Sequence, residues 1–211
     1  MKSSGYTSNM ATRTYTRARR RASAETIDRV LAAAERLIAE GEFHAATMKE
    51  LASAAGISRA TVFNRFGSKL GVLQALADRC AEGPEMQDIQ EALALEDPVT
   101  SLEAVIEASC VIWEASGFIY EQLMAIVVLE PDAVALIEEQ WEDQRADLEG
   151  LTRRLAKVGR LRPGLSKARA TATLHMLMSL ESFLQLRREY GLSLRQTRET
   201  IAQLARTLLR A

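Results

Sequence analysis

The sequence has few of the residues from which metal sites and covalent cross-links are built. Its 211 residues include two cysteines, Cys80 and Cys110, and two histidines, His44 and His175. The cysteines lie 30 residues apart, unlike the short spacings of zinc motifs, so we expect both thiols to be reduced and mostly buried. The composition therefore predicts no transition-metal site, and we expect no cofactor.

A long apolar run is also missing. The longest stretch without a charged residue, Ala170 to Leu180, has eleven residues, well below the roughly 20 residues that a membrane-spanning helix needs. Residues 1–25 carry scattered arginines and have no apolar core of the kind found in secretory signals. We therefore expect a cytoplasmic protein that makes no membrane contact.

The main alternative from another class, an enzyme, finds no support in the residues. There is no glycine-rich phosphate loop, no cluster with metal-ligand spacing and no nucleophile beside an evident base. His175 and Glu181 are six residues apart, so on a helix they would not face each other. We expect no enzymatic activity, and assays of hydrolase or transferase activity on metabolite pools would test this expectation.

Apolar residues make up 47% of the chain and charged residues 26%, as is usual for a soluble globular protein. The net charge of −1 hides an uneven distribution. Residues 1–80 hold 13 Lys and Arg against 7 Asp and Glu, whereas residues 81–211 hold 14 against 21. Chance could produce such a division, but it is typical of a basic module that meets a polyanion joined to a module that does not.

Apolar residues recur at steps of three and four along nearly the whole chain, and no strand-like alternation or internal repeat is present. The pattern predicts an all-α fold, with helix starts at Ser, Thr or Asp caps and helix ends at glycines. The expected helices cover residues 23–40, 47–55, 58–66, 68–82, 86–95, 118–129, 131–158, 166–190 and 193–208, with another that starts at Asp97-Pro98 or at Thr100 and ends at 116.

The helices predict a division into three parts. Residues 1–22 lack periodicity and are expected to form a flexible basic arm. Residues 23–82 are expected to form a first helical domain, whose fourth helix links it to the rest of the chain. Residues 83–211 are expected to form a second, larger helical domain.

The stretch from Thr47 to Phe66 has the pattern of a helix-turn-helix. Thr47 and Glu50 form a capping box that opens a short helix, and Gly56 provides a turn that tolerates unusual backbone angles. The next helix buries Val62 and Phe66 and leaves side chains that can bond to phosphates and base edges in the major groove. These exposed candidates are Ser58, Arg59, Thr61, Asn64 and Arg65.

The run from Thr47 to Lys69, TMKELASAAGISRATVFNRFGSK, closely resembles the DNA-binding segment of the tetracycline-repressor (TetR) family. The resemblance extends from about the first helix to the start of the fourth. It implies that the Thr47 helix start and Lys69 hold phosphates, and that Arg59, Thr61 and Asn64 face bases or the sugar-phosphate backbone.

The sequence departs from the family pattern at three positions. Phe63 occupies the place of a tyrosine whose hydroxyl usually reaches a phosphate, a bond that phenylalanine cannot make. Arg65 stands where histidine is common and adds a permanent charge. Leu70 stands where an acidic residue is frequent.

The arginines of the arm, among them Arg19, Arg20 and Arg21, allow two interpretations. The arm can follow the phosphate backbone or enter the minor groove, as N-terminal arms of other DNA-binding proteins do. It can equally be a solvated basic tail. Because each phosphate contact contributes about one unit to the salt dependence of binding, truncation of the arm distinguishes the two.

Beyond residue 81 the resemblance is much looser. The family usually forms its dimer through the last two long helices, and residues 176–186 carry apolar side chains nearly all round the predicted helix, which requires cover on more than one face. A wholly internal helix in a monomer is the alternative. The candidate dimer residues are Met176, Leu180, Phe183, Leu184, Ile201, Leu204 and Leu208.

Bulky apolar residues with a few polar tips favour a ligand cavity in the same part of the chain. Each of them taken alone is more typical of a core. The candidates are Cys110, Trp113, Phe118, Tyr120, Met124, Trp141, His175 and Met178.

Together these patterns predict a DNA-binding transcriptional regulator. We expect a homodimer on an inverted-repeat operator in double-stranded DNA, with a small apolar or aromatic effector releasing a repressor from that operator. A constitutive helix-turn-helix dimer without a small-molecule ligand is the alternative.

Overall fold

The computed structural model describes the backbone of residues 6–129 and 135–210, and the side chains of residues 21–125 and 142–210. Helices dominate these ranges, and their one strand-like feature is an isolated bridge between Leu161 and Leu209. The predicted all-α fold is confirmed. The elements are α1 (Tyr6–Ala39), α2 (Met48–Ala55), α3 (Arg59–Phe66), α4 (Lys69–Ala81), α5 (Pro84–Ala94), α6 (Pro98–Leu129), α7 (Ala135–Lys157), α8 (Lys167–Leu177), α9 (Leu180–Leu184), the π-helix η2 (Gln185–Glu189) and α10 (Leu194–Arg206).

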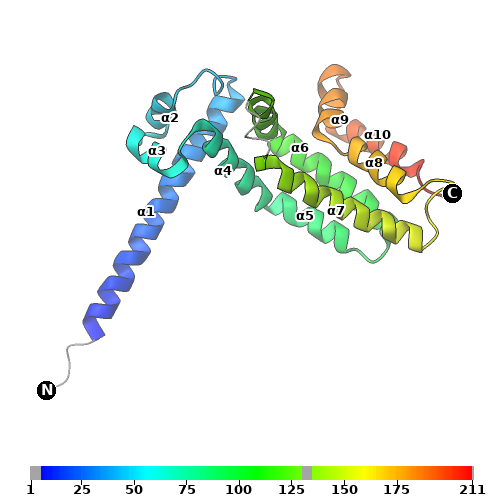
Figure 1. Cartoon of the computed structure of the whole chain (residues 1–211), viewed down its shortest axis with the longest axis horizontal. Coiled ribbons are helices and arrows are strands. Elements are labelled where there is room, and N and C mark those ends of the chain that lie inside the picture. Colours follow the sequence, from blue (N-terminus) through cyan, green and yellow to red (C-terminus); the bar gives the residue numbers. More distant parts are fainter. Residues whose placement is uncertain (1–5, 130–134, 211) are drawn as a thin grey trace. The chain divides into compact units, whose positions relative to one another are not determined.

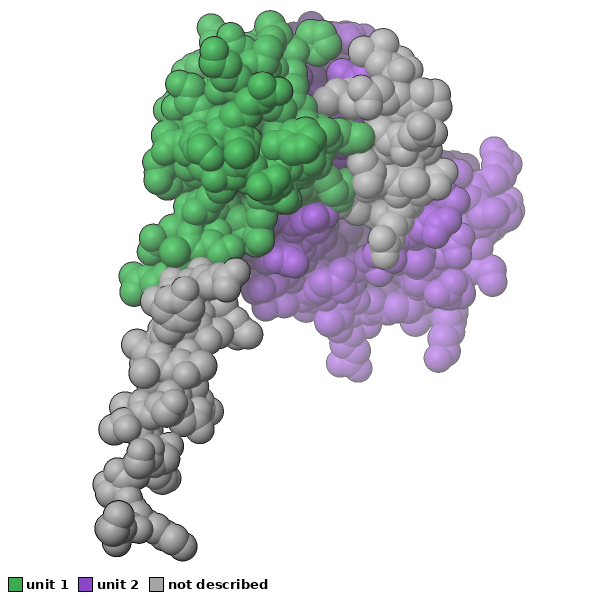
Figure 2. Space-filling model, turned by 60° about the vertical axis from the view of Figure 1, so that its left-hand side comes forward, with its two compact units in different colours: residues 1–76 green, residues 77–211 purple. Residues whose placement is uncertain are grey.

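The chain divides into two compact units, residues 1–76 and 77–211, coloured separately in Figure 2. The division falls within α4. In the first unit, α2 packs against α1, and α3 packs against α2 (Figure 1). Their shared core is apolar and closely packed, as the burial of Leu51, Val62 and Leu73 shows. A helix-turn-helix of this size depends on such tertiary packing, because helices of eight residues are not stable alone.

The start of α1 corrects one prediction. The helix begins at Tyr6, so Ser23 lies inside it and does not cap it, and residues 6–22 continue the helix where a flexible arm was expected. The physical reason is cooperativity: once a helix is nucleated by packing, each further residue costs little, and Arg, Ala and Met are good helix formers.

The second unit is a helical bundle around one apolar core. Helices α5, α6 and α7 lie side by side, with α8 and α10 next to them (Figure 1). Leu102, Leu151 and Leu174 meet in the core from α6, α7 and α8. The start of α6 was left open between two caps, and the structure decides for the first: the Asp97 carboxylate accepts hydrogen bonds from the backbone N–H and the hydroxyl of Thr100, at 2.8 and 2.7 Å.

Helix α6 also runs without interruption through Gly117, where the sequence predicted a break between two helices. Gly117 is buried, and a Cβ at this position would come within 2.9 Å of the Leu180 side chain. The glycine therefore permits close contact between α6 and α9 and does not end a helix.

The predicted single helix over residues 166–190 is wrong, because the chain breaks after α8 and restarts at Ser179. Ser179 is the N-cap of α9, because its hydroxyl accepts a hydrogen bond from the backbone N–H of Ser182. The indole N–H of Trp113 donates to the carbonyl of Met178 at 2.8 Å. A tryptophan on α6 thus binds a carbonyl group exactly where α8 ends.

A row of ion pairs joins α6 to the C-terminal segment. The pairs are Glu103–Arg206 at 2.8 Å, Glu107–Arg198 at 2.5 Å, Glu114–Arg187 at 2.7 Å and Glu121–Arg188 at 2.5 Å. The partner of Glu103 comes from the end of α10 and that of Glu121 from η2, so this segment runs antiparallel to α6. Exposed pairs add little stability each, but together they define one register. Across the described residues, no helix combines the length and the apolar character that crossing a bilayer requires.

Candidate nucleic-acid interface

The start of α2 has the capping box that the sequence predicts. The Thr47 hydroxyl accepts from the backbone N–H of Glu50 at 3.2 Å, and the Glu50 carboxylate accepts from the backbone N–H of Thr47 at 2.7 Å. The hydroxyl also donates to that carboxylate at 2.9 Å. These bonds hold the pKa of the Glu50 carboxyl below its ordinary value. Because the hydroxyl is engaged, a phosphate at this helix start would meet backbone N–H groups of the first turn.

The turn between α2 and α3 depends on Gly56 and on a residue of α1. Gly56 adopts the left-handed conformation, with φ 63° and ψ 38°. The Arg29 guanidinium donates to its carbonyl at 2.9 Å, and a Cβ on Gly56 would lie 2.6 Å from the same guanidinium. The left-handed backbone angles therefore favour glycine here, and a side chain at this position would displace the Arg29 guanidinium.

Helix α3 buries one side and exposes the other. Val62 is 1% exposed, whereas Phe63 is 55% exposed. Every hydrogen-bonding side chain predicted for the groove is exposed, namely Ser58, Arg59, Thr61, Asn64 and Arg65. The helix thus presents a surface of mixed hydrogen-bonding groups and one aromatic ring.

Two of these side chains also serve the helix itself. The Ser58 hydroxyl caps α3 by accepting from the backbone N–H of Thr61 at 3.1 Å, and the two hydroxyls lie 2.8 Å apart. Ser58 and Thr61 therefore position the first turn of α3, and each hydroxyl keeps part of its bonding capacity for a ligand.

Lys69 has an internal contact that the sequence did not predict. Its ammonium donates to the carbonyl of His44 at 2.7 Å and lies over the Phe43 ring, 5.0 Å from the centroid. Partial burial lowers the pKa of Lys69 below its ordinary value. The lysine therefore ties the start of α4 to the loop before α2, and an ammonium has further N–H groups for a phosphate.

The junction of α3 and α4 is close-packed at Gly71. A Cβ at Gly71 would overlap the carbonyl oxygen of Phe66. Glycine therefore allows the first turn of α4 to lie against the end of α3.

Three basic residues near the turn were missed by sequence reasoning. Arg29 and Arg36 lie seven residues apart on α1. Arg29 donates to the Gly56 carbonyl and Arg36 donates to the Ala54 carbonyl at 3.5 Å, so both bind carbonyl groups at the end of α2. Lys49 is exposed in the first turn of α2. The seven-residue spacing of the two arginines was the signal available in the sequence.

Of the three arginines predicted for the arm, only Arg21 has a side chain that the structure describes. Arg21 is highly exposed and forms an ion pair with Glu25 one turn later in α1, at 3.3 Å. The side chains of Arg19 and Arg20 lie outside the described residues.

The predicted ligand-pocket residues are partly brought together. Cys110, Trp113 and Met178 belong to one core cluster, and the Trp113 and Tyr120 rings meet edge to face with centroids 5.6 Å apart. Burial raises the pKa of Cys110 to about 11 and that of Tyr120 to about 12. Phe118 and Met124 are half-buried, and the Trp141 side chain is outside the described residues.

His175 carries an unusual feature of this region. Its Nε2 atom is buried and has no hydrogen-bond partner among the described residues. An open hollow of this unit lies elsewhere, between the end of α7 and the start of α8, and none of the eight candidates lines it.

The predicted dimer residues divide into two groups. Leu180, Phe183, Ile201 and Leu208 are buried in the subunit's own fold, and Leu184 packs against the same core. The assignment of the four buried residues to a dimer surface is corrected, because a side chain already covered by its own subunit offers little area to a partner, whereas the half-buried Leu184 stays a candidate. Met176 and Leu204 remain 58% and 46% exposed.

Two comparisons with known proteins find similarity in the first third of the chain. The family model described as bacterial regulatory proteins, tetR family, matches residues 30–76. The HTH-type transcriptional regulator AlkX of Mycobacterium tuberculosis is 44% identical over 55 residues, which is 26% of this chain and 26% of that protein. The match thus spans about a quarter of the curated relative.

Solved structures share the fold over nearly the whole chain. The TetR-family regulator PfmR from Thermus thermophilus has a TM-score of 0.68 at 23% identity, covering 86% of this chain and 99% of its own. A regulator structure from Saccharomonospora viridis, in complex with choline, has a TM-score of 0.75 at 20% identity, covering 89% and 100%. The ketosteroid regulator KstR2 of Mycobacterium tuberculosis has a TM-score of 0.64 at 18% identity, covering 88% of this chain and 95% of its own.

The segment matched in these comparisons contains α2 and α3, the two helices with the exposed surface described above. Residues 30–76 are therefore similar to the segment described as bacterial regulatory proteins, tetR family, and most of the chain shares the helical fold of solved regulators.

Proposed function

We propose that the protein is a dimeric repressor that binds an inverted-repeat operator through α3 and leaves it when a small apolar or aromatic effector binds. The observation that carries the DNA-binding part is the exposure of every polar side chain from Ser58 to Arg65, while Val62 anchors the helix from behind. Such a helix fits the major groove of B-DNA, which is about 12 Å wide.

The side chains of α3 are suited to different contacts. Arg59 and Asn64 can form paired hydrogen bonds, Arg with guanine and Asn with adenine, which distinguish base pairs in the major groove. Ser58, Thr61 and Arg65 suit phosphate or sugar contacts that position the helix. Lys69 and the first turn of α2 add phosphate contacts at the edge of the interface.

A selection from random duplex DNA followed by fluorescence anisotropy tests this proposal. The selected sites should contain two half-sites about 10 base pairs apart, one helical turn. Arg59→Ala and Asn64→Ala should each weaken binding by about 1–3 kcal/mol and relax the preference at one base pair. Arg145→Ala, on exposed α7 surface, is the control; equal losses in the control and the α3 variants would contradict the role of α3.

The dimer is expected to form through α8 and α10, which pack against each other. Met176 and Leu204 are large apolar side chains left uncovered on these two helices. Uncovered apolar side chains on adjacent helices are typical of subunit contacts.

Size-exclusion chromatography with light scattering tests the dimer. Met176→Glu with Leu204→Glu should yield a monomer that loses the inverted-repeat complex but keeps its helical content. Val158→Glu is a matched control, because Val158 is also a large apolar residue with more than half of its surface exposed. A dimer that persists in the double variant would place the interface elsewhere.

The effector site is proposed near Trp113, Tyr120 and His175. The edge-to-face aromatic pair offers apolar surface, and the unpartnered His175 Nε2 offers a polar atom to a ligand. A buried polar atom without a partner carries a free-energy cost that a ligand hydrogen bond can recover.

A thermal-shift screen with apolar and aromatic compounds separates the sensor from a constitutive dimer. A ligand that prefers the folded state raises the melting temperature, and a true effector also lowers operator affinity, by about 5- to 150-fold for an ordinary coupling energy. Stabilising compounds that leave operator binding unchanged would favour the constitutive alternative.

A further inference from the structure

The turn between α7 and α8 concentrates positive charge in an otherwise acidic unit. Residues 150–180 contain seven Lys and Arg and no Asp or Glu, whereas the rest of residues 81–211 contains 7 Lys and Arg against 21 Asp and Glu. The distribution is not explained by the DNA-binding surface, which lies in the other unit.

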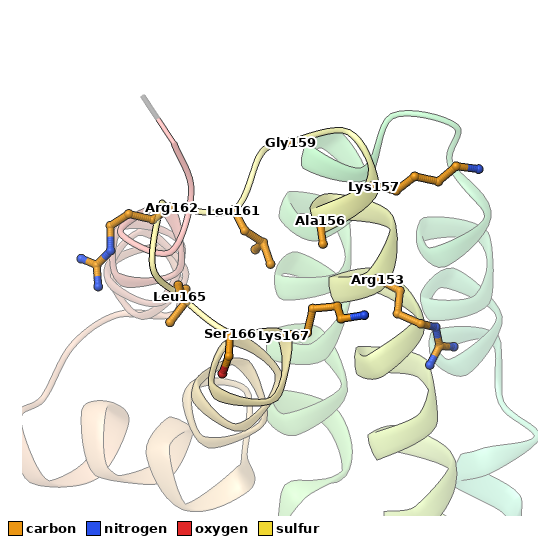
Figure 3. Close-up of a pocket in the computed structure, with 9 residues that line it drawn as sticks. All are labelled: Arg153, Ala156, Lys157, Gly159, Leu161, Arg162, Leu165, Ser166 and Lys167. Atoms are coloured by element: carbon orange, nitrogen blue, oxygen red, sulfur yellow. The ribbon is translucent and has the colours of Figure 1, made fainter.

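Four of these basic residues line an open hollow of about 660 Å³. Its rim carries Arg153 and Lys157 from the end of α7, Arg162 from the loop and Lys167 from the first turn of α8. Figure 3 shows Lys167 extending toward Arg153, whereas the charged ends of Lys157 and Arg162 point away from the space between the two helices. The residues lining the hollow include no carboxylate. We refer to it as the basic hollow.

Several other arginines of this unit are neutralised by ion pairs with glutamates, whereas the cations of the basic hollow mostly are not. Arg187, Arg188, Arg198 and Arg206 each contact a glutamate at 2.8 Å or less. By contrast, Lys157, Arg162 and Lys167 form no ion pair with any carboxylate of the described residues, and Arg153 has only Glu149, at 3.8 Å. Like charges held together without counter-ions repel one another, so an anion between them would be bound favourably.

The residues that line the basic hollow indicate which class of anion it would bind. Guanidinium groups bind phosphate oxygens with paired hydrogen bonds, and ammonium groups bind them as point charges. The positive end of α8 opens onto the same hollow, with Ser166 as its N-cap. The loop is held in place, since the backbone N–H of Arg162 donates to the Leu208 carbonyl at 2.8 Å.

We propose that the basic hollow binds a polyvalent phosphate-bearing anion, either a free polyphosphate or a phospholipid headgroup. This site is separate from the proposed effector site and does not depend on it. Lys167 of α8, which extends toward Arg153 of α7 (Figure 3), would share one ligand with that arginine, and Lys157 and Arg162 would add to the positive potential around it.

Isothermal titration calorimetry of the full chain with sodium tripolyphosphate at low ionic strength tests the proposal. Arg153→Gln with Lys167→Gln should weaken binding about tenfold or more, because charge-assisted hydrogen bonds to phosphate are strong. Arg145→Gln with Arg195→Gln removes the same charge from exposed positions of the same unit, outside the hollow, and should leave binding unchanged. Circular dichroism should show unchanged helix content in both double variants.

The DNA-binding unit requires its own variant, because it can also attract polyphosphate. Arg59→Gln with Arg65→Gln should leave the high-affinity tripolyphosphate site intact. If that variant abolishes binding while Arg153→Gln with Lys167→Gln does not, or if tripolyphosphate and vesicles both fail to bind, the proposal is overturned.

Flotation with phosphatidylcholine vesicles containing phosphatidylglycerol distinguishes a phospholipid headgroup from a free polyphosphate as the ligand. Vesicle binding that depends on Arg153 and Lys167 supports a lipid headgroup. Tripolyphosphate binding with the same dependence and no vesicle binding supports a free anion. Vesicle binding that ignores both residues counts against the hollow as a lipid site.

Discussion

The guanidinium of Arg29 binds the carbonyl of Gly56 at 2.9 Å, across 27 residues of sequence. Through this bond α1 holds the turn that orients α3. The same guanidinium occupies the space that a side chain on residue 56 would need. The orientation of the exposed helix therefore depends on a pair of residues that do not belong to it.

Arg29→Ala should lower the free energy of unfolding by about 1.5–3 kcal/mol, the usual contribution of a hydrogen bond to a charged group. Gly56→Ala should also destabilise, because alanine is strained at positive φ. In the Arg29→Ala background the second change should cost less, since the clash with the guanidinium is gone. Urea unfolding of all four proteins measures this coupling; strictly additive effects would rule it out.

Phe63→Tyr should strengthen operator binding by about 0.5–1.5 kcal/mol, because the added hydroxyl can donate to a phosphate. The wild-type ring is exposed on α3 and has no such group. Fluorescence anisotropy on the selected operator measures the change, and Phe63→Leu is the control that lacks both ring and hydroxyl. An unchanged affinity for Phe63→Tyr would mean that the ring does not face the DNA backbone.

Trp113→Phe should destabilise the second unit by about 1–3 kcal/mol, because the Met178 carbonyl at the end of α8 loses its indole donor. Hydrogen exchange should rise at residues 176–182, where the helix breaks, more than in α5. Tyr120→Phe is the matched control, since it changes the other ring of the aromatic pair and leaves the Met178 bond in place. Equal exchange in both variants would indicate that the bond does not hold the break.

Alkaline pH should weaken the fold through Cys110. Burial raises the pKa of its thiol from an ordinary value of 9.0 to about 11, so the folded protein keeps this proton over a range in which the unfolded chain loses it. Stability should therefore fall between pH 9 and about 11, by about 2–3 kcal/mol at 1.36 kcal/mol per pKa unit. In Cys110→Ala this part of the pH slope should disappear.

Native alkylation provides a second measure of the same thiol. Cys80 is half-buried and Cys110 is buried, so iodoacetamide should modify Cys80 first at neutral pH. Rapid modification of Cys110 in the folded protein would contradict its burial and the raised pKa.

Local sequence predicted most of the helix-turn-helix. The capping box at Thr47, the glycine at position 56 and the cap at Ser58 are short-range signals, because each acts on backbone groups within three or four residues. They could be found without any knowledge of the fold. Because periodicity and helix caps agree over this stretch, together they favour a helix-turn-helix.

Other features escaped prediction because they depend on distant residues. Gly117 has the character of a helix end, but Leu180 determines its role as a packing site. Ser179 offers a cap inside an apolar pattern, and the break there also uses the indole of Trp113. The apolar faces around Phe183 and Ile201 predicted burial correctly, but periodicity cannot say whether the cover comes from the same subunit or from a partner.

The amino-acid sequence by itself determined the all-helical fold and the residues that α3 presents, since helix caps and periodicity are local properties of the chain. Only the tertiary structure decided which apolar side chains remain uncovered, where the helices break and where unpaired cations gather beside a hollow. These depend on contacts between residues far apart in the chain, and no local pattern encodes the partner of such a contact.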